Sequence, residues 1–289
     1  MKYAVFYNPL AGASGKEIAL TKAKRLFFGK DAEYYDVTET DIAGFIKNLD
    51  TERAIVVLGG DGTLNRFVNS VSVLPENDIY YYPAGSGNDF FREFGVNPVE
   101  SGPIKINGYL TELPVARVCG KEYKFINNVG FGIDGYCCEE GDRLRAENPG
   151  KTIDYTKIAI RGLLFDFKPV NAKITVDGNT HEYSNVWLAP TMNGKFYGGG
   201  MMPTPLQDRT DAESKVSLMV LTCKSKLKTL MIFPSIFKGE HVKYDKQVKI
   251  FTGNEIKVEF DRPTALQIDG ETIKNITEYT VIKGKTVEK

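Results

Sequence analysis

Residues 58–65 of the chain read Leu58-Gly59-Gly60-Asp61-Gly62-Thr63-Leu64-Asn65. An apolar run at 54–58 leads into this stretch and predicts a buried strand, and apolar residues at helical spacing follow it. Glycines let the backbone approach a ligand closely, and the free amides at the start of a helix attract anions. The stretch therefore predicts a phosphate-binding loop between a strand and a helix, with a tight turn capped by Asp61 as the structural alternative.

Strand and helix patterns alternate on both sides of this loop, up to about residue 110. Helical apolar spacing separates the predicted strands, so successive strands are connected by helices. Repeated strand–helix–strand units form mostly parallel sheets with helices on both faces. We therefore predict an N-terminal α/β domain, doubly wound and Rossmann-like, with strands at 3–7, 34–37, 54–58 and 79–82.

A second glycine-rich loop reads Pro83-Ala84-Gly85-Ser86-Gly87-Asn88-Asp89-Phe90. It also follows a predicted strand and precedes a helical pattern, and Asn8-Pro9 ends the first strand. Open parallel sheets bind ligands at the carboxyl ends of their strands. We therefore expect the three segments to form one nucleotide site, although helix capping explains Asn88 and Asp89 equally well.

The pattern changes after about residue 111. Asp177-Gly178 is a strong hairpin signal, and two helical inserts are expected near 154–165 and 225–237. These features predict an antiparallel β-sandwich domain. Its predicted strands cover 113–118, 123–126, 172–176, 183–188, 216–222, 248–251, 256–260 and 265–268. We place the domains at 1–112 and 113–275, and expect 276–289 to be a C-terminal segment that could pack back on the first domain.

The composition limits the classes of function. Acidic and basic residues number 37 each, so the net charge gives no reason to expect nucleic acid. The sequence has no HExxH motif and no nucleophile elbow, which argues against zinc hydrolysis and Ser-His-Asp chemistry. The four cysteines form no CxxC pair, which is typical of reduced thiols in the cytosol. No stretch approaches the ~20 apolar residues of a membrane span. We expect a cytoplasmic protein whose membrane contact is peripheral.

The two glycine-rich loops together resemble those of the diacylglycerol kinase catalytic-domain family, which includes bacterial soluble lipid kinases and is related to sphingosine and ceramide kinases. The resemblance continues in the same order along nearly the whole chain, through Asn8-Pro9, Asn128-Val129-Gly130-Phe131-Gly132-Ile133-Asp134, Gly198-Gly199-Gly200-Met201 with Pro205, and Gln267-Ile268-Asp269-Gly270-Glu271. It implies a nucleotide-binding α/β domain followed by a β-sandwich. It also implies an ATP-dependent lipid kinase, with diacylglycerol as the default substrate and phosphatidic acid as the product.

The resemblance also implies roles for single residues. Glu271 matches the position of the proton acceptor in bacterial members, within a turn that includes Asp269, and Asp61 is the second candidate for that base. Asp61 would also orient the phosphates and their Mg²⁺. Without the resemblance, Asp269-Gly270 reads as an ordinary β-turn. The ATP site would comprise Asn8, Pro9, Thr38, Gly59, Gly60, Asp61, Gly62, Thr63, Asn65, Ser86 and Asn88.

Bacterial members carry a structural Mg²⁺ in the loop after the triple glycine, which corresponds to residues 208–213 here. Asp211 would supply a carboxylate, and Asp208 and Glu213 would contribute mainly backbone carbonyls. Ala212 stands where the family usually has glycine, so the alternative is an acidic, solvated loop. A second departure is Arg66, at a position where the family usually has glutamate.

Residues 225–239 combine apolar side chains with flanking lysines. This pattern suits a helix on a membrane surface, and a helix packed on the β-domain is the alternative. The resemblance further implies a lipid substrate at the membrane surface and the possibility of a homodimer.

Two other functions compete with the lipid kinase. NAD kinases share the Gly59-Gly60-Asp61-Gly62-Thr63 loop and the two-domain plan, and would act on a soluble dinucleotide. A catalytically silent nucleotide- or lipid-binding regulator is the second alternative, against which the presence of both Asp61 and Glu271 argues.

Overall fold

The computed structural model describes residues 2–10, 16–85, 87–148, 150–211, 213 and 215–283, apart from the side chain of Lys16. The chain divides into two compact units, residues 1–111 and 112–289, one residue before the boundary that we expected from the sequence.

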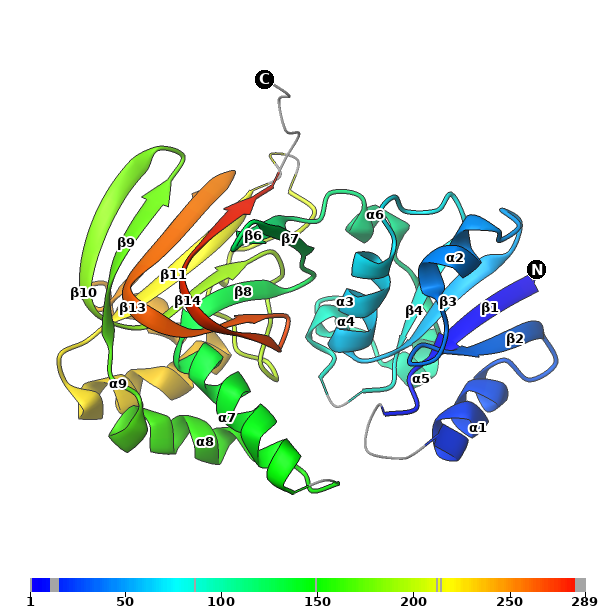
Figure 1. Cartoon of the computed structure of the whole chain (residues 1–289), viewed down its shortest axis with the longest axis horizontal. Helices are drawn as coiled ribbons and strands as arrows, with labels where there is room; N and C mark the ends of the chain where they lie inside the picture. Colours follow the sequence, from blue (N-terminus) through cyan, green and yellow to red (C-terminus); the bar gives the residue numbers. More distant parts are fainter. Residues whose placement is uncertain are drawn as a thin grey trace. The chain divides into compact units, whose positions relative to one another are not determined.

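A five-stranded sheet forms the centre of the first unit (Figure 1). Its strands lie in the order β2-β1-β3-β4-β5, and the first four are parallel while the short β5 is antiparallel to β4. The order reverses beside β1, as in doubly wound sheets. The predicted parallel α/β domain is therefore confirmed. The strands are β1 (Lys2–Tyr7), β2 (Asp31–Asp36), β3 (Ala54–Gly59), β4 (Ile79–Pro83) and β5 (Ile104–Lys105).

Helices cover both faces of this sheet because its strands are apolar on both sides. Val5 and Tyr7 pack with Phe27 after α1, whereas Phe6 faces the opposite way and contacts Phe45 of α2 and Phe67 of α3. The central strand β3 is buried along its whole length. The helices are α1 (Lys16–Leu26), α2 (Ile42–Lys47), α3 (Asp61–Ser70), α4 (Asp89–Arg92), α5 (Pro98–Ser101) and α6 (Asn107–Leu110).

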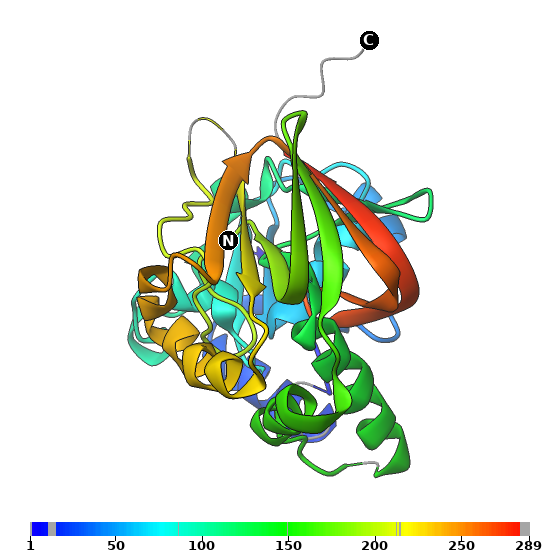
Figure 2. The same cartoon turned by 90° about the vertical axis from the view of Figure 1, so that its left-hand side faces the viewer.

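The second unit is built from antiparallel strands that enclose one apolar core (Figure 2). The main path runs β12-β11-β10-β8-β13-β14-β6-β7, and β9 pairs with both β10 and β13. The strands are β6 (Val115–Val118), β7 (Lys121–Lys124), β8 (Asn128–Gly132), β9 (Val170–Val176), β10 (Asn179–Met192), β11 (Val216–Thr222), β12 (Val248–Gly253), β13 (Glu255–Ile268) and β14 (Glu271–Ile282). The predicted β-rich domain is confirmed.

Two long strands, β10 and β13, each pair with different partners at their two ends. Residues 188–192 of β10 pair with β8 and residues 179–186 pair with β9. In the same way, residues 266–268 of β13 pair with β8 and residues 256–260 pair with β9. The register of β13 shifts between Glu259 and Thr264. Such irregularities bend a strand, so both strands wrap around the shared core.

The helices of the second unit gather at one end of its strands (Figures 1 and 2). The two expected inserts are present, but α7 was not predicted, because its fifteen residues carry little apolar periodicity. The helices are α7 (Ile133–Glu147), α8 (Tyr155–Arg161), the π-turn η2 (Gly162–Asp166), α9 (Lys226–Ile232) and the 3₁₀ segments η3 (Phe233–Lys238) and η4 (Glu240–Lys243). None of the helices among the described residues is both long and apolar enough to cross a membrane.

Our prediction of a separate C-terminal segment from residue 276 is wrong for residues 276–282. These residues continue β14, which pairs with β13 and β6 of the second unit. Ile276, Tyr279 and Val281 are buried in the β-domain core, and this burial keeps the strand within the second unit. Residues 284–289 lie outside the described residues.

Candidate functional site

The two glycine-rich loops of the first unit touch each other through their backbones. Gly60 lies between β3 and α3, and a Cβ at this position would lie 2.7 Å from the Gly87 carbonyl oxygen. A Cβ on Gly85 would lie 2.5 Å from the Gly60 Cα. Neither distance is possible for a real side chain. The close approach of the two loops therefore requires glycine at both positions.

Asp61 holds the second loop in place. Its Oδ2 accepts a hydrogen bond from the Asp89 amide at 2.7 Å, and its Oδ1 accepts one from the Phe90 amide at 3.1 Å. The Asp61 amide in turn donates to the Gly87 carbonyl at 3.1 Å. Asp61 is therefore the first residue of α3, and its carboxylate caps the N-terminus of α4, where a negative charge is favourable.

Asn8, Gly59 and Thr63 meet at the ends of β1 and β3. The Asn8 side chain donates to Thr63 Oγ1 at 2.9 Å, and its backbone amide donates to the Leu58 carbonyl at 3.2 Å. A Cβ on Gly59 would lie 2.3 Å from Thr63 Oγ1, so glycine makes room for the threonine. Pro9 follows and is buried. The structure brings these predicted residues together.

The other predicted ATP-site residues lie at the same ends of the strands. Thr38 follows β2, and its hydroxyl donates to Asp36 Oδ1 at 2.6 Å. Asn65 is on α3, and its carbonyl accepts a hydrogen bond from the Asn69 side chain at 3.0 Å. The Asn88 side chain donates to the Gly85 carbonyl at 2.8 Å, while its buried Oδ1 has no hydrogen-bond partner among the residues that the structure describes. Ser86 lies outside the described residues.

This edge of the sheet is chemically suited to a polyphosphate. It presents glycine backbone, the N-terminus of the ten-residue helix α3 and the amide side chains of Asn8 and Asn88. Backbone amides and a helix N-terminus favour bound anions. No packing contact explains Gly62, because a Cβ there would meet nothing within 4 Å. We interpret Gly62 as a position kept small for a ligand.

Glu271 stands in the second unit beside the hairpin turn between β13 and β14. The two turn residues, Asp269 and Gly270, have φ of 47° and 90°. Two successive positive φ angles define the tight hairpin turn for which Asp-Gly is favoured. Glu271 is exposed as the first residue of β14. Its approach to Asp61 stays a prediction.

The Asp269 carboxylate is occupied within the fold. It accepts hydrogen bonds from three successive backbone amides, those of Ile126, Asn127 and Asn128. The Asp269 amide also donates to the Asn128 carbonyl at 2.9 Å. This geometry gives Asp269 a positioning role in holding the turn, and it leaves Glu271 as the exposed carboxylate there.

Sequence reasoning assigned no role to Asp134 and Gln267, which form a buried network behind this turn. The Gln267 side chain donates to Asp134 Oδ2 at 3.3 Å and accepts a hydrogen bond from the Gly270 amide at 2.9 Å. Burial raises the pKa of Asp134 from 3.8 to about 7, against hydrogen bonds from Gly135 and Gln267. An acid two residues after Gly132, in Gly130-Phe131-Gly132-Ile133-Asp134, was the available signal.

The expected Mg²⁺ site at the acidic loop stays a prediction. The Asp208 carbonyl accepts from the Asp211 amide at 3.3 Å, and the Glu213 carbonyl accepts from the Asn254 side chain at 3.2 Å. The carboxylates of Asp208 and Asp211 accept hydrogen bonds from backbone amides two residues on. No group of three metal-ligating side chains converges among the described residues, which exclude Ala212 of this loop.

Two basic side chains, Lys283 and Arg209, make hydrogen bonds at this loop. Lys283 is 4% exposed, and its Nζ donates to the Arg209 carbonyl at 3.2 Å. The Arg209 guanidinium donates to the Ile126 carbonyl at 3.0 Å and to the Asn127 side chain at 3.1 Å. Arg209 thus ties the acidic loop to the segment that Asp269 also holds. Lys283 and Arg209 thus hold the backbone of this loop by hydrogen bonds.

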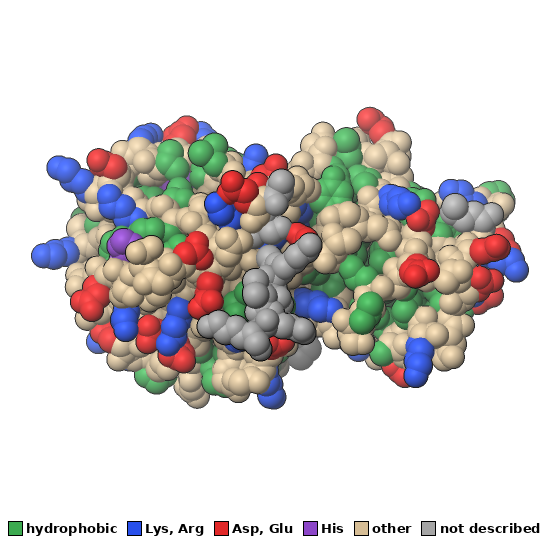
Figure 3. Space-filling model, turned by 90° about the horizontal axis from the view of Figure 1, so that it is seen from above, with side chains coloured by type: hydrophobic (Ala, Val, Ile, Leu, Met, Phe, Trp, Pro, Cys, Tyr) green, Lys and Arg blue, Asp and Glu red, His purple; other side chains and the backbone are tan. Residues whose placement is uncertain are grey.

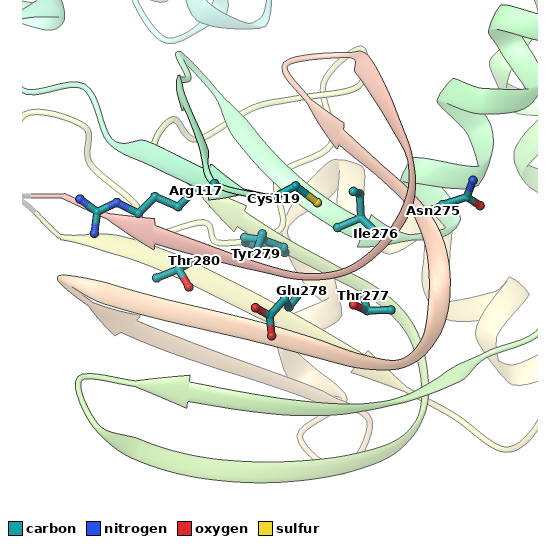
Figure 4. A pocket seen from close by; sticks show the side chains of 9 residues that line it. Arg117, Cys119, Asn275, Ile276, Thr277, Glu278, Tyr279 and Thr280 are labelled. Carbon is teal, nitrogen blue, oxygen red and sulfur yellow. The ribbon is translucent and has the colours of Figure 1, made fainter.

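A separate hollow of about 370 Å³ lies beside β6 and β14 (Figure 4). None of the predicted site residues lines it. Its two charged lining residues, Arg117 and Glu278, are paired with Glu122 and Lys257. We assign no function to this hollow.

Two family models match the chain. Residues 2–117 match the diacylglycerol kinase catalytic domain, and residues 127–286 match the YegS C-terminal NAD kinase beta sandwich-like domain. The second match alone covers more than half of the chain. The chain therefore belongs to the diacylglycerol kinase catalytic-domain family, and its second unit is of the YegS β-sandwich-like type.

Individual relatives agree with this family. The chain is 30% identical over 263 residues to a diacylglycerol kinase of Mycobacterium tuberculosis, covering 85% of this chain and 81% of the relative. It is 24% identical over 283 residues to a diacylglycerol kinase of Bacillus subtilis, covering 92% and 88%. The crystal structure of a "putative diacylglycerol kinase" from Bacillus anthracis superposes with a TM-score of 0.70 at 21% identity, covering 98% and 92%. This last likeness supports the fold.

Proposed function

We propose that the protein is an ATP-dependent lipid kinase that transfers the γ-phosphate to a lipid hydroxyl, with diacylglycerol as the default substrate and phosphatidic acid as the product. One observation carries the proposal. The two glycine-rich loops are joined at the end of a parallel sheet by the Asp61 carboxylate and by backbone contact between Gly60 and Gly85. A loop pair of this kind is suited to hold the phosphates of a nucleotide.

The proposed reaction assigns a role to each part. Asn8, Thr63 and the amides of residues 59–62 hold the phosphates. Glu271 accepts the proton of the lipid hydroxyl while the hydroxyl oxygen bonds to the γ-phosphorus. The bond from that phosphorus to the bridging oxygen breaks, and ADP leaves. Mg²⁺, carried on the nucleotide with Asp61 nearby, would spread the phosphate charge. Catalysis then rests mainly on positioning and electrostatics.

The default substrate follows from the relatives, two of which are named diacylglycerol kinase. An NAD kinase remains the second candidate, because it would share the first glycine-rich loop. The exposed carboxylate of Glu271, held by the Asp269 turn, favours the lipid kinase over a silent regulator. We further propose a cytoplasmic protein that touches membranes peripherally and does not bind nucleic acid, and a homodimer remains compatible with this proposal.

The test is incubation with γ-labelled ATP and a panel of lipids, with NAD as the control acceptor. The panel contains diacylglycerol, monoacylglycerol, ceramide, a sphingoid base and a polyprenol. Label in one lipid product supports the proposal and names the substrate. Label in NADP alone would replace it with the NAD kinase, and no transfer to any acceptor would favour the silent regulator.

A further inference from the structure

Exposed apolar side chains concentrate on the helical end of the second unit. Of the fifteen large hydrophobic residues that are exposed among the described residues, seven lie within 155–166 and 227–242. The five that matter here are Ile160, Phe165, Leu227, Met231 and Phe237, which we call the helical face. Phe165 is 71% exposed and Leu227 is 74% exposed. Contiguous exposed apolar surface marks an interaction site.

These residues belong to elements that pack against one another. Leu227 and Met231 are four residues apart on α9 and therefore share one side of that helix, while Thr229 and Ile232 are buried on the other side. The Lys226 ammonium donates to the Leu164 carbonyl at 2.8 Å, which places the start of α9 beside η2 and hence near Phe165. Figures 1 and 2 show α8 and α9 at the same end of the strands.

The two segments that carry the helical face are strongly basic. Residues 155–168 and 224–243 contain eight basic side chains and two acidic ones, although the whole chain is balanced. Arg161 and Lys243 are paired with these two acids, Asp166 and Glu240. The excess consists of Lys157, Lys168, Lys224, Lys226, Lys228 and Lys238. The face of the second unit seen in Figure 3 differs, because acidic and basic side chains are interspersed there.

We infer that the helical face docks on an anionic lipid surface. Exposed apolar side chains enter the boundary between headgroups and acyl chains, while the surrounding lysines reach the negative headgroups. A second copy of the chain is a poorer occupant, because it would bring two positive surfaces together. The inference rests on the proposed function, since a lipid kinase must reach a substrate that resides in a membrane.

The test compares binding of three variants to vesicles. The first replaces Phe165, Leu227 and Met231 with Gln, and the second replaces Lys224, Lys228 and Lys238 with Gln. The control replaces Val73 and Val99, which are 80% and 83% exposed on the first unit. These positions are exposed except for Lys228, which is partly buried, so thermal unfolding should change little. Vesicles of phosphatidylcholine, with or without phosphatidylglycerol, are sedimented with each protein.

We expect the wild type to bind only the vesicles that contain phosphatidylglycerol. Each triple variant should bind them on the order of 10²-fold more weakly, from lost apolar burial or from about three lost charge contacts. The lysine effect should fade at high salt, and the control variant should bind normally. Unchanged binding by either triple variant would overturn the inference, as would a dimer in solution that the Phe165, Leu227 and Met231 variant dissociates.

A soluble short-chain diacylglycerol separates this inference from the proposed function. Its phosphorylation needs no membrane, so both triple variants should phosphorylate it at the wild-type rate while losing activity on vesicles. Absence of activity on the soluble lipid in the wild type would contradict the proposed function itself. Equal activity of all variants on vesicles would contradict only the docking surface.

Discussion

Asp61→Ala should cost the first unit stability as well as activity. The substitution removes the acceptor of the Asp89 and Phe90 amides, which begin α4. Hydrogen bonds to a charged group contribute about 1.5–3 kcal/mol each, and water can replace part of that at a partly buried site. We therefore expect the free energy of unfolding to fall by roughly 2–4 kcal/mol.

A matched control is available in the same unit. Asp41 also caps a helix, since its side chain accepts a hydrogen bond from the Gly44 amide at 3.1 Å, but it joins no second loop. Asp41→Ala should therefore cost only about 1 kcal/mol, the usual value for an N-cap. Urea unfolding followed by circular dichroism measures both variants.

Asp61→Asn is a milder change at the same position. Asp61→Asn keeps one acceptor oxygen but turns an amide group toward a backbone N–H, so it should cost about 1–3 kcal/mol. Kinase turnover should be lost in both Asp61 variants. The joining of the two loops by this carboxylate is refuted if the free energy of unfolding of Asp61→Ala lies within about 0.5 kcal/mol of the wild-type value. It is also refuted if Asp61→Ala is less destabilised than Asp41→Ala.

Three further predictions follow from buried or crowded positions. Gly85→Ala should destabilise the first unit by about 1–3 kcal/mol because its Cβ would collide with Gly60, whereas Gly62→Ala should not destabilise it, and equal effects in urea unfolding would contradict this. The pKa of Asp134, about 7 in the fold against 3.8 ordinarily, means that the native state keeps a proton which the unfolded chain has lost. The free energy of unfolding should therefore fall, by up to roughly 4 kcal/mol, as pH rises from about 4 to about 7, and Asp134→Asn should flatten that slope; an unchanged slope would contradict the assignment. Lys283 is buried and donates to the Arg209 carbonyl of the acidic loop, so Lys283→Met should lower the thermal midpoint; a fall in the midpoint with EDTA would support the expected Mg²⁺ site, and an unchanged midpoint would contradict it.

The sequence was informative wherever a structural element depends on a pattern of neighbouring residues. Apolar runs and helical spacing predicted the parallel sheet and its helices, because each element buries its own residues. The glycine loops were recognisable because glycine is needed where backbones approach closely. The contact of Gly60 with Gly85 had no local signal, since it joins loops far apart in the chain.

The misses share a dependence on tertiary contacts. The role of Asp269 depends on three amides of residues 126–128, and these lie more than 140 residues away in the chain. The acidic loop receives a hydrogen bond from Lys283, which lies 74 residues beyond Arg209 in the chain. Residues 276–282 read Ile-Thr-Glu-Tyr-Thr-Val-Ile, a strand pattern that our sequence analysis did not use, and they pair with β13 and β6.

Transfer of label from γ-labelled ATP to short-chain diacylglycerol, compared between the wild type and Glu271→Gln, tests both the lipid kinase activity and the role of Glu271 as the base. The substitution keeps the shape of the side chain and removes its basicity. We expect labelled phosphatidic acid from the wild type. The variant should have a kcat roughly 10²–10⁴-fold lower and should bind ATP as tightly as the wild type. Labelled lipid formed at equal rates by both proteins, or no labelled lipid from the wild type, would contradict this expectation.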